Sequence, residues 1–130
     1  MKRRTVSSVE TMSPLTELTR EILAFRDQRN WAQFHSLRNL IVSLNLEAAE
    51  LLELTQWQSD AQIAALPADV KTRAALSDEC ADVFIYLLLI AEKAGIDIEK
   101  AARIKLEKNA RRYPVASSYG SSRKCSSGSD

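Results

Sequence analysis

The sequence predicts an all-α fold with four main helices. Glycine and proline are scarce, with three of each in 130 residues. They separate long segments whose apolar residues recur at helical spacing, rather than in the alternation typical of strands. With 45% hydrophobic and 27% charged residues, the chain is long enough for one domain and has enough apolar material for one core.

The first two helices are separated by a short connection. The first is expected over about residues 15–29, where Pro14 suits the first turn. Its apolar stripe consists of Leu15, Leu18, Ile22 and Phe25. Ser36 is a candidate N-cap for the second, which is expected to run to about residue 57. Residues 58–67 indicate a polar, alanine-rich loop.

The last two helices have clear boundary signals. The third is expected to begin near Pro67 or Asp69 and to end at Gly95, a residue typical of helix C-termini. Asp97 can cap the fourth helix, and Pro114 terminates it.

The two ends of the chain differ in composition from the helical part. Residues 116–130 contain seven serines and almost nothing apolar, so they cannot bury enough surface to offset the entropy of ordering. This composition predicts a flexible tail, and residues 1–14 indicate a similarly flexible N-terminus. The organised domain is therefore expected over residues 15–115.

Charge and hydropathy exclude several functional classes. The formal net charge of +1 provides no field that attracts nucleic acid or an anionic membrane. The longest apolar run, residues 83–91, is about half of a membrane span. Because the N-terminus also lacks the apolar stretch of a secretory signal, we expect a cytoplasmic protein. Cys80 and Cys125 have no metal-like spacing and are expected to be free thiols.

Two pairs of acidic residues lie three positions apart within apolar helical segments. Glu47 and Glu50 stand among leucines in the second expected helix, whereas Glu79 and Asp82 precede the apolar run FIYLLLIA in the third. The first pair cannot face water without exposing the leucines beside it, and the second pair repeats the arrangement. Four carboxylates are therefore expected on the packing sides of two helices.

Such a concentration of negative charge needs compensation, because each carboxylate loses hydration and repels the others. No Lys or Arg lies on the same turns, so a divalent cation is the natural partner. Ligands that are all oxygen suit Mg²⁺ or Mn²⁺. A di-iron site would need Glu-x-x-His pairs, and the single histidine, His35, is not in that pattern. The pattern alone also leaves open that both pairs are solvated helix faces.

Aromatic and cationic residues near these helices suit a nucleotide. Magnesium sites commonly complete their coordination with substrate phosphates. Four residues could stack on a nucleobase or hydrogen-bond to it, although each could instead be a packing residue: Trp31, His35, Trp57 and Tyr86.

The fourth expected helix becomes polar toward its end. Lys105 and Arg112 could hold phosphates there, and Asn109 could bind a base edge or a sugar. A solvated last turn whose cations favour the helix dipole is the alternative.

Four short blocks occur in a fixed order along the chain. They are W-x-x-F-H-x-x-R-N-L from residue 31, E-A-A-E-L-x-E-L-x-Q-W from residue 47, E-C-A-D-V-x-I-Y-L from residue 79 and K-x-x-x-N-x-x-R-Y-P-V from residue 105. In this order they resemble the MazG-like all-α nucleoside triphosphate pyrophosphohydrolases, and within them the dCTP pyrophosphatase branch. The resemblance spans about residues 15–115.

The resemblance implies a four-helix bundle that forms homodimers or dimers of dimers, hence homotetramers, with sites built across subunit boundaries. It implies a Mg²⁺-dependent enzyme that cleaves a nucleoside triphosphate between the α and β phosphates, giving monophosphate and pyrophosphate. The metal ligands are then Glu47, Glu50, Glu79 and Asp82, and we expect Glu50 to activate the attacking water.

The resemblance also implies a set of residues that hold the nucleotide. These are Trp31, Phe34, His35, Trp57, Tyr86, Lys105, Asn109, Arg112 and Tyr113. The expected substrate is dCTP or a modified dCTP, in a house-cleaning role. Ile22 stands where the mammalian member of this branch has a histidine, so dUTP and other non-standard nucleotides stay open as substrates. A non-catalytic nucleotide-sensing or interaction module is a separate alternative.

Overall fold

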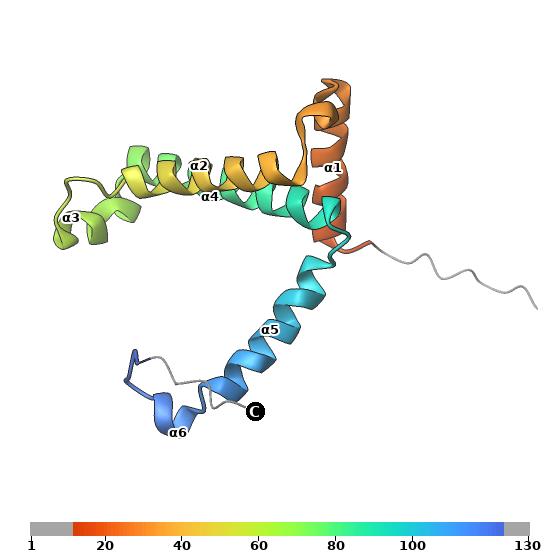
Figure 1. Cartoon of the computed structure of the whole chain (residues 1–130). Helices are drawn as coiled ribbons and strands as arrows, with labels where there is room; N and C mark the ends of the chain where they lie inside the picture. Colours follow the sequence, from red (N-terminus) through yellow and green to blue (C-terminus); the bar gives the residue numbers. More distant parts are fainter. Residues whose placement is uncertain (1–11, 124–130) are drawn as a thin grey trace, which may run out of the picture. The chain divides into compact units, whose positions relative to one another are not determined.

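The computed structural model describes residues 12–123, which are almost entirely helical. Four long helices are α1 (Pro14–Gln28), α2 (Leu37–Glu53), α4 (Val70–Lys93) and α5 (Ile98–Arg112) (Figure 1). The short ones are the α-helices α3 (Asp60–Ala65) and α6 (Val115–Ser118) and the 3-10 helices η1 (Trp31–Phe34) and η2 (Leu66–Ala68). The described residues contain no strand, so the predicted all-α class is confirmed.

Side-chain caps fix where the long helices begin. Ser36 Oγ accepts a hydrogen bond from the Asn39 backbone N–H at 3.1 Å at the start of α2. Asp97 caps α5 in the same way through the Lys100 N–H at 3.0 Å. Each such bond satisfies a backbone N–H that has no partner within the helix, which contributes about 0.5–2 kcal/mol. Both predicted caps are confirmed.

The segment between α2 and α4 differs from the expected loop over residues 58–67. Helix α2 ends at Glu53, earlier than expected, and α3 lies within the supposed loop. Its first turn is a capping box, because Ser59 Oγ accepts from the Gln62 N–H at 3.3 Å while Gln62 Oε1 accepts from the Ser59 N–H at 2.8 Å. These reciprocal bonds let a short alanine-rich segment become helical. The loop prediction is wrong for this reason.

The predicted flexible ends are described only in part. Residues 1–11 and 124–130, including Cys125, lie outside the described residues. Within the predicted tail, residues up to Ser118 belong to α6. The flexibility of both ends stays a prediction. Cys80 is an exposed free thiol, as expected.

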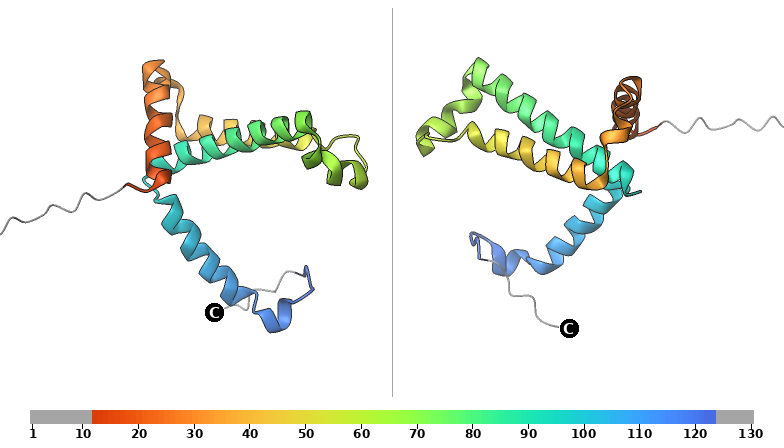
Figure 2. Two further views of the ribbon diagram at one scale, coloured as in Figure 1. Left: turned by 180° about the vertical axis from the view of Figure 1, so that it is seen from behind. Right: turned by 45° about the horizontal axis from the view of Figure 1, so that its top comes forward.

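The chain divides into two units, residues 1–94 and 95–130. In the first, α2 and α4 lie side by side and antiparallel, and α1 crosses them at the end where α2 begins (Figures 1 and 2). The fully buried side chains among the described residues lie near this crossing: Leu40, Leu88, Leu89 and Ala91. The second unit contains α5 and α6. None of the helices in residues 12–123 has both the length and the apolar character needed to cross a membrane.

The Leu88→Ala variant tests this core. Leu88 is 1% exposed, so its truncation is expected to lower the free energy of unfolding by about 2–5 kcal/mol. Val70→Ala on the same helix is the control, because Val70 is 85% exposed and its truncation should cost less than about 0.5 kcal/mol. Urea unfolding monitored by circular dichroism measures both. Equal losses would contradict a core centred on Leu88.

Candidate active site

The antiparallel pairing of α2 with α4 brings three carboxylates together. Glu47 and Glu50 lie three residues apart on α2, a spacing that puts them on neighbouring positions of one helix face. Glu79 approaches them from α4. One carboxylate oxygen from each residue lies within 4.8 Å of the other two. The structure thus gathers three of the four predicted metal ligands, which we call the acidic cluster.

The electrostatics of the acidic cluster oppose ionisation of its half-buried members. Burial raises the pKa of the Glu47 carboxyl, and the charges of Glu50, Asp82 and Glu79 raise it further. Burial likewise raises the pKa of Glu79, followed by the charges of Glu50 and Asp82. One oxygen of Glu79, Oε2, is also buried without a hydrogen-bond partner. An unpaired buried acceptor of this kind costs free energy unless a ligand pairs with it.

The ion pairs of residues 12–123 leave the acidic cluster uncompensated. They join Arg26 to Asp27 and Glu92, and Arg103 to Glu99. A bound cation could supply this compensation. The cluster offers only carboxylate oxygens, and one of them is a buried acceptor without a partner, so its chemistry fits a hard divalent cation. Glu47, Glu50 and Glu79 could therefore hold a metal ion.

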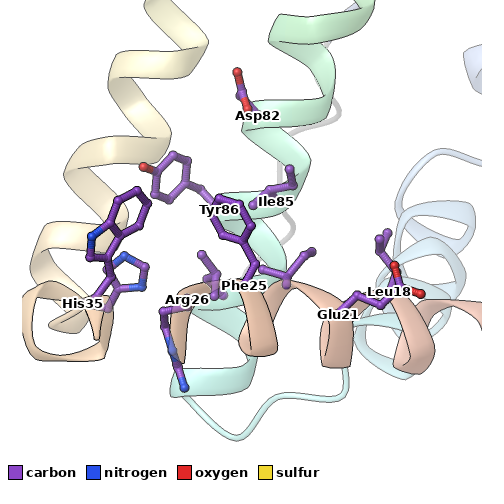
Figure 3. Close-up of a pocket in the computed structure, with 11 residues that line it drawn as sticks. Leu18, Glu21, Phe25, Arg26, His35, Asp82, Ile85 and Tyr86 are labelled. Atoms are coloured by element: carbon purple, nitrogen blue, oxygen red, sulfur yellow. The ribbon is translucent and has the colours of Figure 1, made fainter. Parts of the chain in front are cut away.

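A pocket of about 450 Å³ lies between α1, η1 and α4 in the first unit. Its lining residues are Leu18, Glu21, Ile22, Phe25, Arg26, Trp31, His35, Asp82, Ile85, Tyr86 and Leu89. Figure 3 shows Phe25 extending from α1 toward α4, beside Tyr86, with His35 to one side. The head group of Arg26 points away from these rings, consistent with its pairing to Asp27 and Glu92.

Asp82, the fourth predicted ligand, connects the pocket to the acidic cluster. It lines the pocket, three residues after Glu79 on α4 and four before Tyr86. Its charge also acts on Glu47 and Glu79. A ligand with a flat ring and an anionic chain could therefore place the ring among the aromatic side chains and the chain beside the carboxylates.

His35 adds a polar group to a largely apolar pocket. Burial lowers the pKa of His35, and the nearby charges of Arg26 and Lys93 lower it further, so the imidazole is neutral at pH 7. Its Nδ1 atom is buried without a hydrogen-bond partner. A ligand that pairs with this nitrogen would be favoured over one that leaves it unpaired.

Two predicted nucleotide-binding residues do not line this pocket. Trp57 is 92% exposed and has a left-handed backbone conformation with φ of 62°. Phe34 is 60% exposed, and its carbonyl accepts a hydrogen bond from Asn39 Nδ2 at 2.9 Å. The structure therefore brings Trp31, His35 and Tyr86 together without Trp57 or Phe34.

The predicted phosphate-binding residues belong to the second unit. Lys105 and Asn109 lie on α5, and Arg112 is its last residue. The Tyr113 N–H donates to the Asn109 carbonyl at 2.8 Å, and the Arg112 guanidinium lies 5.5 Å from the Tyr113 ring centroid. Their contact with a nucleotide stays a prediction.

Several residues near the site were not predicted from the sequence. Phe25 was recognised as apolar, but its place in the pocket depends on how α1 crosses α4. Glu21 and Arg26 reach the pocket for the same reason. Glu53 and Asp78 add their charges to those that act on Glu79. For Glu53, the three-residue spacing from Glu50 was an available signal.

Known proteins share this fold and sequence pattern. The model of the MazG-like family matches residues 42–127. The dCTP pyrophosphatase 1 of Rattus norvegicus is 42% identical over 107 residues, or 82% of this chain, and that of Homo sapiens is 39% identical over 110 residues, or 85%. A crystal structure of a pyrophosphatase from Archaeoglobus fulgidus superposes with a TM-score of 0.74 at 37% identity, over 81% of this chain and 96% of that one.

The curated relatives are longer than the matched region. The match covers 63% of the rat protein and 65% of the human protein. The similarity nevertheless includes both the acidic cluster and the helices that hold it.

Replacing Glu79 should stabilise the metal-free protein at neutral pH. A carboxyl whose pKa is raised by folding binds more protons in the folded than in the unfolded state. The stability that the protonated Glu79 carboxyl contributes is therefore lost as the pH rises from its ordinary pKa of 4.5 through its raised pKa in the folded state. In the presence of EDTA, Glu79→Gln should have a higher Tm than wild type at neutral pH, and the difference should vanish below the ordinary pKa.

Thermal unfolding from acid to neutral pH measures this effect. Glu17→Gln on α1 is the control, because Glu17 is exposed and lies outside the acidic cluster. A Glu79→Gln variant no more stable than wild type at neutral pH would contradict the electrostatic description.

Proposed function

Because the chain belongs to the MazG-like family, we propose that it is a Mg²⁺-dependent nucleoside triphosphate pyrophosphohydrolase that acts on dCTP or a modified dCTP. The observation that carries this proposal is the connection of an acidic cluster to an aromatic pocket through Asp82. Similarity to the dCTP pyrophosphatases supports the reaction and the choice of base. The role would be house-cleaning of the nucleotide pool, in the cytoplasm.

Four carboxylates would hold the ion. Glu47, Glu50 and Glu79 supply the acidic cluster, and Asp82 would extend it toward the pocket. When bound at these carboxylates, Mg²⁺, or Mn²⁺ in its place, would neutralise charge on the triphosphate and on the leaving pyrophosphate.

Among these acids, Glu50 is proposed to orient and deprotonate the attacking water. Glu50 is exposed, so water reaches it, whereas Glu47 and Glu79 are half-buried. The water oxygen forms a bond to phosphorus, its proton passes to the Glu50 carboxylate, and the anhydride bond between the α and β phosphates breaks. Monophosphate and pyrophosphate are released.

The pocket would hold the base. Trp31 and Tyr86 offer ring surface, and base–aromatic stacking contributes about 1–3 kcal/mol. The unpartnered Nδ1 of the neutral His35 could pair with a base edge. Ile22 contributes an apolar side chain from α1 to the pocket lining. This environment supports a nucleobase in general, so dUTP and other non-standard nucleotides are the alternative substrates.

The proposed nucleotide-binding set also includes residues that do not line the pocket. Lys105 and Arg112 would bind phosphates, and Asn109 a sugar or a base edge. Phe34 and Tyr113 belong to the same proposed set. Trp57, exposed in its own chain, would reach the nucleotide of a second copy.

Exposed apolar side chains support self-association. Only four hydrophobic residues are buried among residues 12–123, although 45% of the chain is hydrophobic. Leu46 on α2 and Phe84 and Leu87 on α4 are among those left exposed. A chain of this size normally buries a larger core. We therefore propose a homodimer or homotetramer in which copies cover these faces.

Product analysis tests the proposed reaction. The purified protein is incubated with each deoxy- and ribonucleoside triphosphate and Mg²⁺, and ion-exchange chromatography separates the products. We expect monophosphate and pyrophosphate, fastest from dCTP and abolished by EDTA. A different best base would replace dCTP as the substrate, and diphosphate with phosphate would contradict the reaction. Nucleotide binding without turnover would instead favour the sensing module.

Glu50→Gln tests the proposed base. It should fold normally and lose about 10²–10⁴-fold in kcat, the usual effect of removing a general base. Circular dichroism checks the fold, and Glu17→Gln is the control for removal of a distant carboxylate. Wild-type turnover by Glu50→Gln would exclude this role.

Native mass tests self-association. Multi-angle light scattering after gel filtration should give two or four times the chain mass of 14.5 kDa. A monomer at the concentrations used in the activity assay would contradict the proposed assembly.

A further inference from the structure

The corner between α1 and η1 contains a cluster of one cation and two aromatic rings. The Arg29 guanidinium carbon lies 3.6 Å from the centroid of the Phe25 ring and 6.0 Å from that of Trp31. The two rings meet edge to face, with centroids 5.9 Å apart and planes at 76°. Arg29 Nη1 also donates to the Phe25 carbonyl at 2.9 Å. One residue thus contacts both rings.

The backbone places Arg29 at this corner. It follows the last residue of α1, and its N–H still donates to the Arg26 carbonyl at 3.2 Å. Asn30 then adopts the left-handed conformation with φ of 53°, and its carbonyl accepts from Gln33 Nε2 at 2.9 Å. The chain therefore reverses directly after Arg29, which brings Trp31 back beside Phe25.

Phe25 and Trp31 line the pocket, whereas Arg29 does not. Both aromatic side chains are about half exposed, so core packing does not fix their rotamers. A guanidinium stacked on one ring and near the other restricts both, since cation–π and edge-to-face contacts each depend on ring orientation. Arg29 is itself exposed, so any effect that it has on the pocket would pass through these two rings.

We propose that Arg29 is a positioning residue for nucleotide binding, which holds Phe25 and Trp31 in the arrangement that receives the base. The inference depends on the proposed function, because the ligand of the pocket is taken to be a nucleotide. When only a fraction of molecules has the competent arrangement, the apparent affinity falls by that fraction. Loss of Arg29 should therefore weaken substrate binding without changing the chemistry at the acidic cluster.

Kinetics of Arg29→Gln and Arg29→Lys test the inference. For Arg29→Gln, we expect KM for dCTP to rise about three- to tenfold while kcat stays within about twofold, the range that loss of one cation–π contact allows. Arg29→Lys keeps the charge but loses the planar guanidinium, so it should lie between wild type and Arg29→Gln. Arg20→Gln is the matched control, because Arg20 is exposed on the same helix and does not line the pocket.

Tryptophan fluorescence gives a readout that needs no ligand. The chain has two tryptophans, so a Trp57→Phe background leaves Trp31 as the sole emitter. In this background, Arg29→Gln should make Trp31 more accessible to acrylamide quenching and lower its anisotropy, with an unchanged circular dichroism spectrum. Arg20→Gln should leave both signals unchanged.

The outcomes separate this inference from the proposed function. In one outcome the wild type hydrolyses dCTP, but Arg29→Gln has the same KM, or the same Trp31 quenching, as Arg20→Gln. This outcome would overturn the inference and leave the proposed function intact. A fall in kcat at constant KM would also overturn it. Absence of hydrolysis in the wild type would overturn the proposed function. The quenching experiment needs no substrate, so unchanged Trp31 quenching in Arg29→Gln would overturn the role of Arg29 in that case as well.

Discussion

Three carboxylates, those of Glu47, Glu50 and Glu79, lie within 4.8 Å of one another, and no ion pair among residues 12–123 compensates them. Burial and the charges of neighbouring carboxylates both raise the pKa of Glu47 and Glu79, which opposes their ionised forms. Burial elsewhere on the two helices offsets this repulsion. Leu40 of α2 and Leu88 of α4 are buried, and full burial of such side chains contributes about 1.5–3 kcal/mol each. A cation bound only by the folded state would remove the repulsion and stabilise the fold by mass action. Stability and metal binding would therefore be coupled through the same side chains.

The rest of the site follows from the antiparallel pairing and from the crossing of α1. Helix α4 extends from the acidic cluster to the aromatic pocket, so Glu79, Asp82 and Tyr86 occupy successive turns of one rigid element. Helix α1 and η1 close the pocket from the other side with Phe25 and Trp31. This division suits a ligand with two unlike ends, because a flat ring and a polyanion can be bound by separate groups at a fixed spacing. The helical scaffold sets that spacing, which would favour precise placement of the bond cleaved in the proposed reaction.

Much of this organisation could be predicted from helical periodicity and capping chemistry. The caps Ser36 and Asp97 and the acidic pairs depend on residues close in sequence, and local rules describe them well. The pocket could not be predicted in the same way, because Glu21 and Arg26 reach it only through the crossing of α1 over α4. The turn at Trp57 and the helix after Ser59 depend on a left-handed residue and a reciprocal cap, which composition alone does not reveal. The contribution of Arg29 likewise requires the chain reversal at Asn30.

The binding of Mn²⁺ to the acidic cluster is the measurement that tests the account most directly. Free Mn²⁺ gives a strong electron paramagnetic resonance signal that is lost on binding, so a titration counts bound ions without requiring turnover. The account predicts saturable binding to wild type in the presence of dCMP or a non-hydrolysable dCTP analogue, weakened at least about tenfold in Glu79→Gln, since loss of one charged ligand removes more than about 1.4 kcal/mol. No retention of Mn²⁺ by the wild type, or equal retention by Glu79→Gln, would contradict a metal site at these carboxylates.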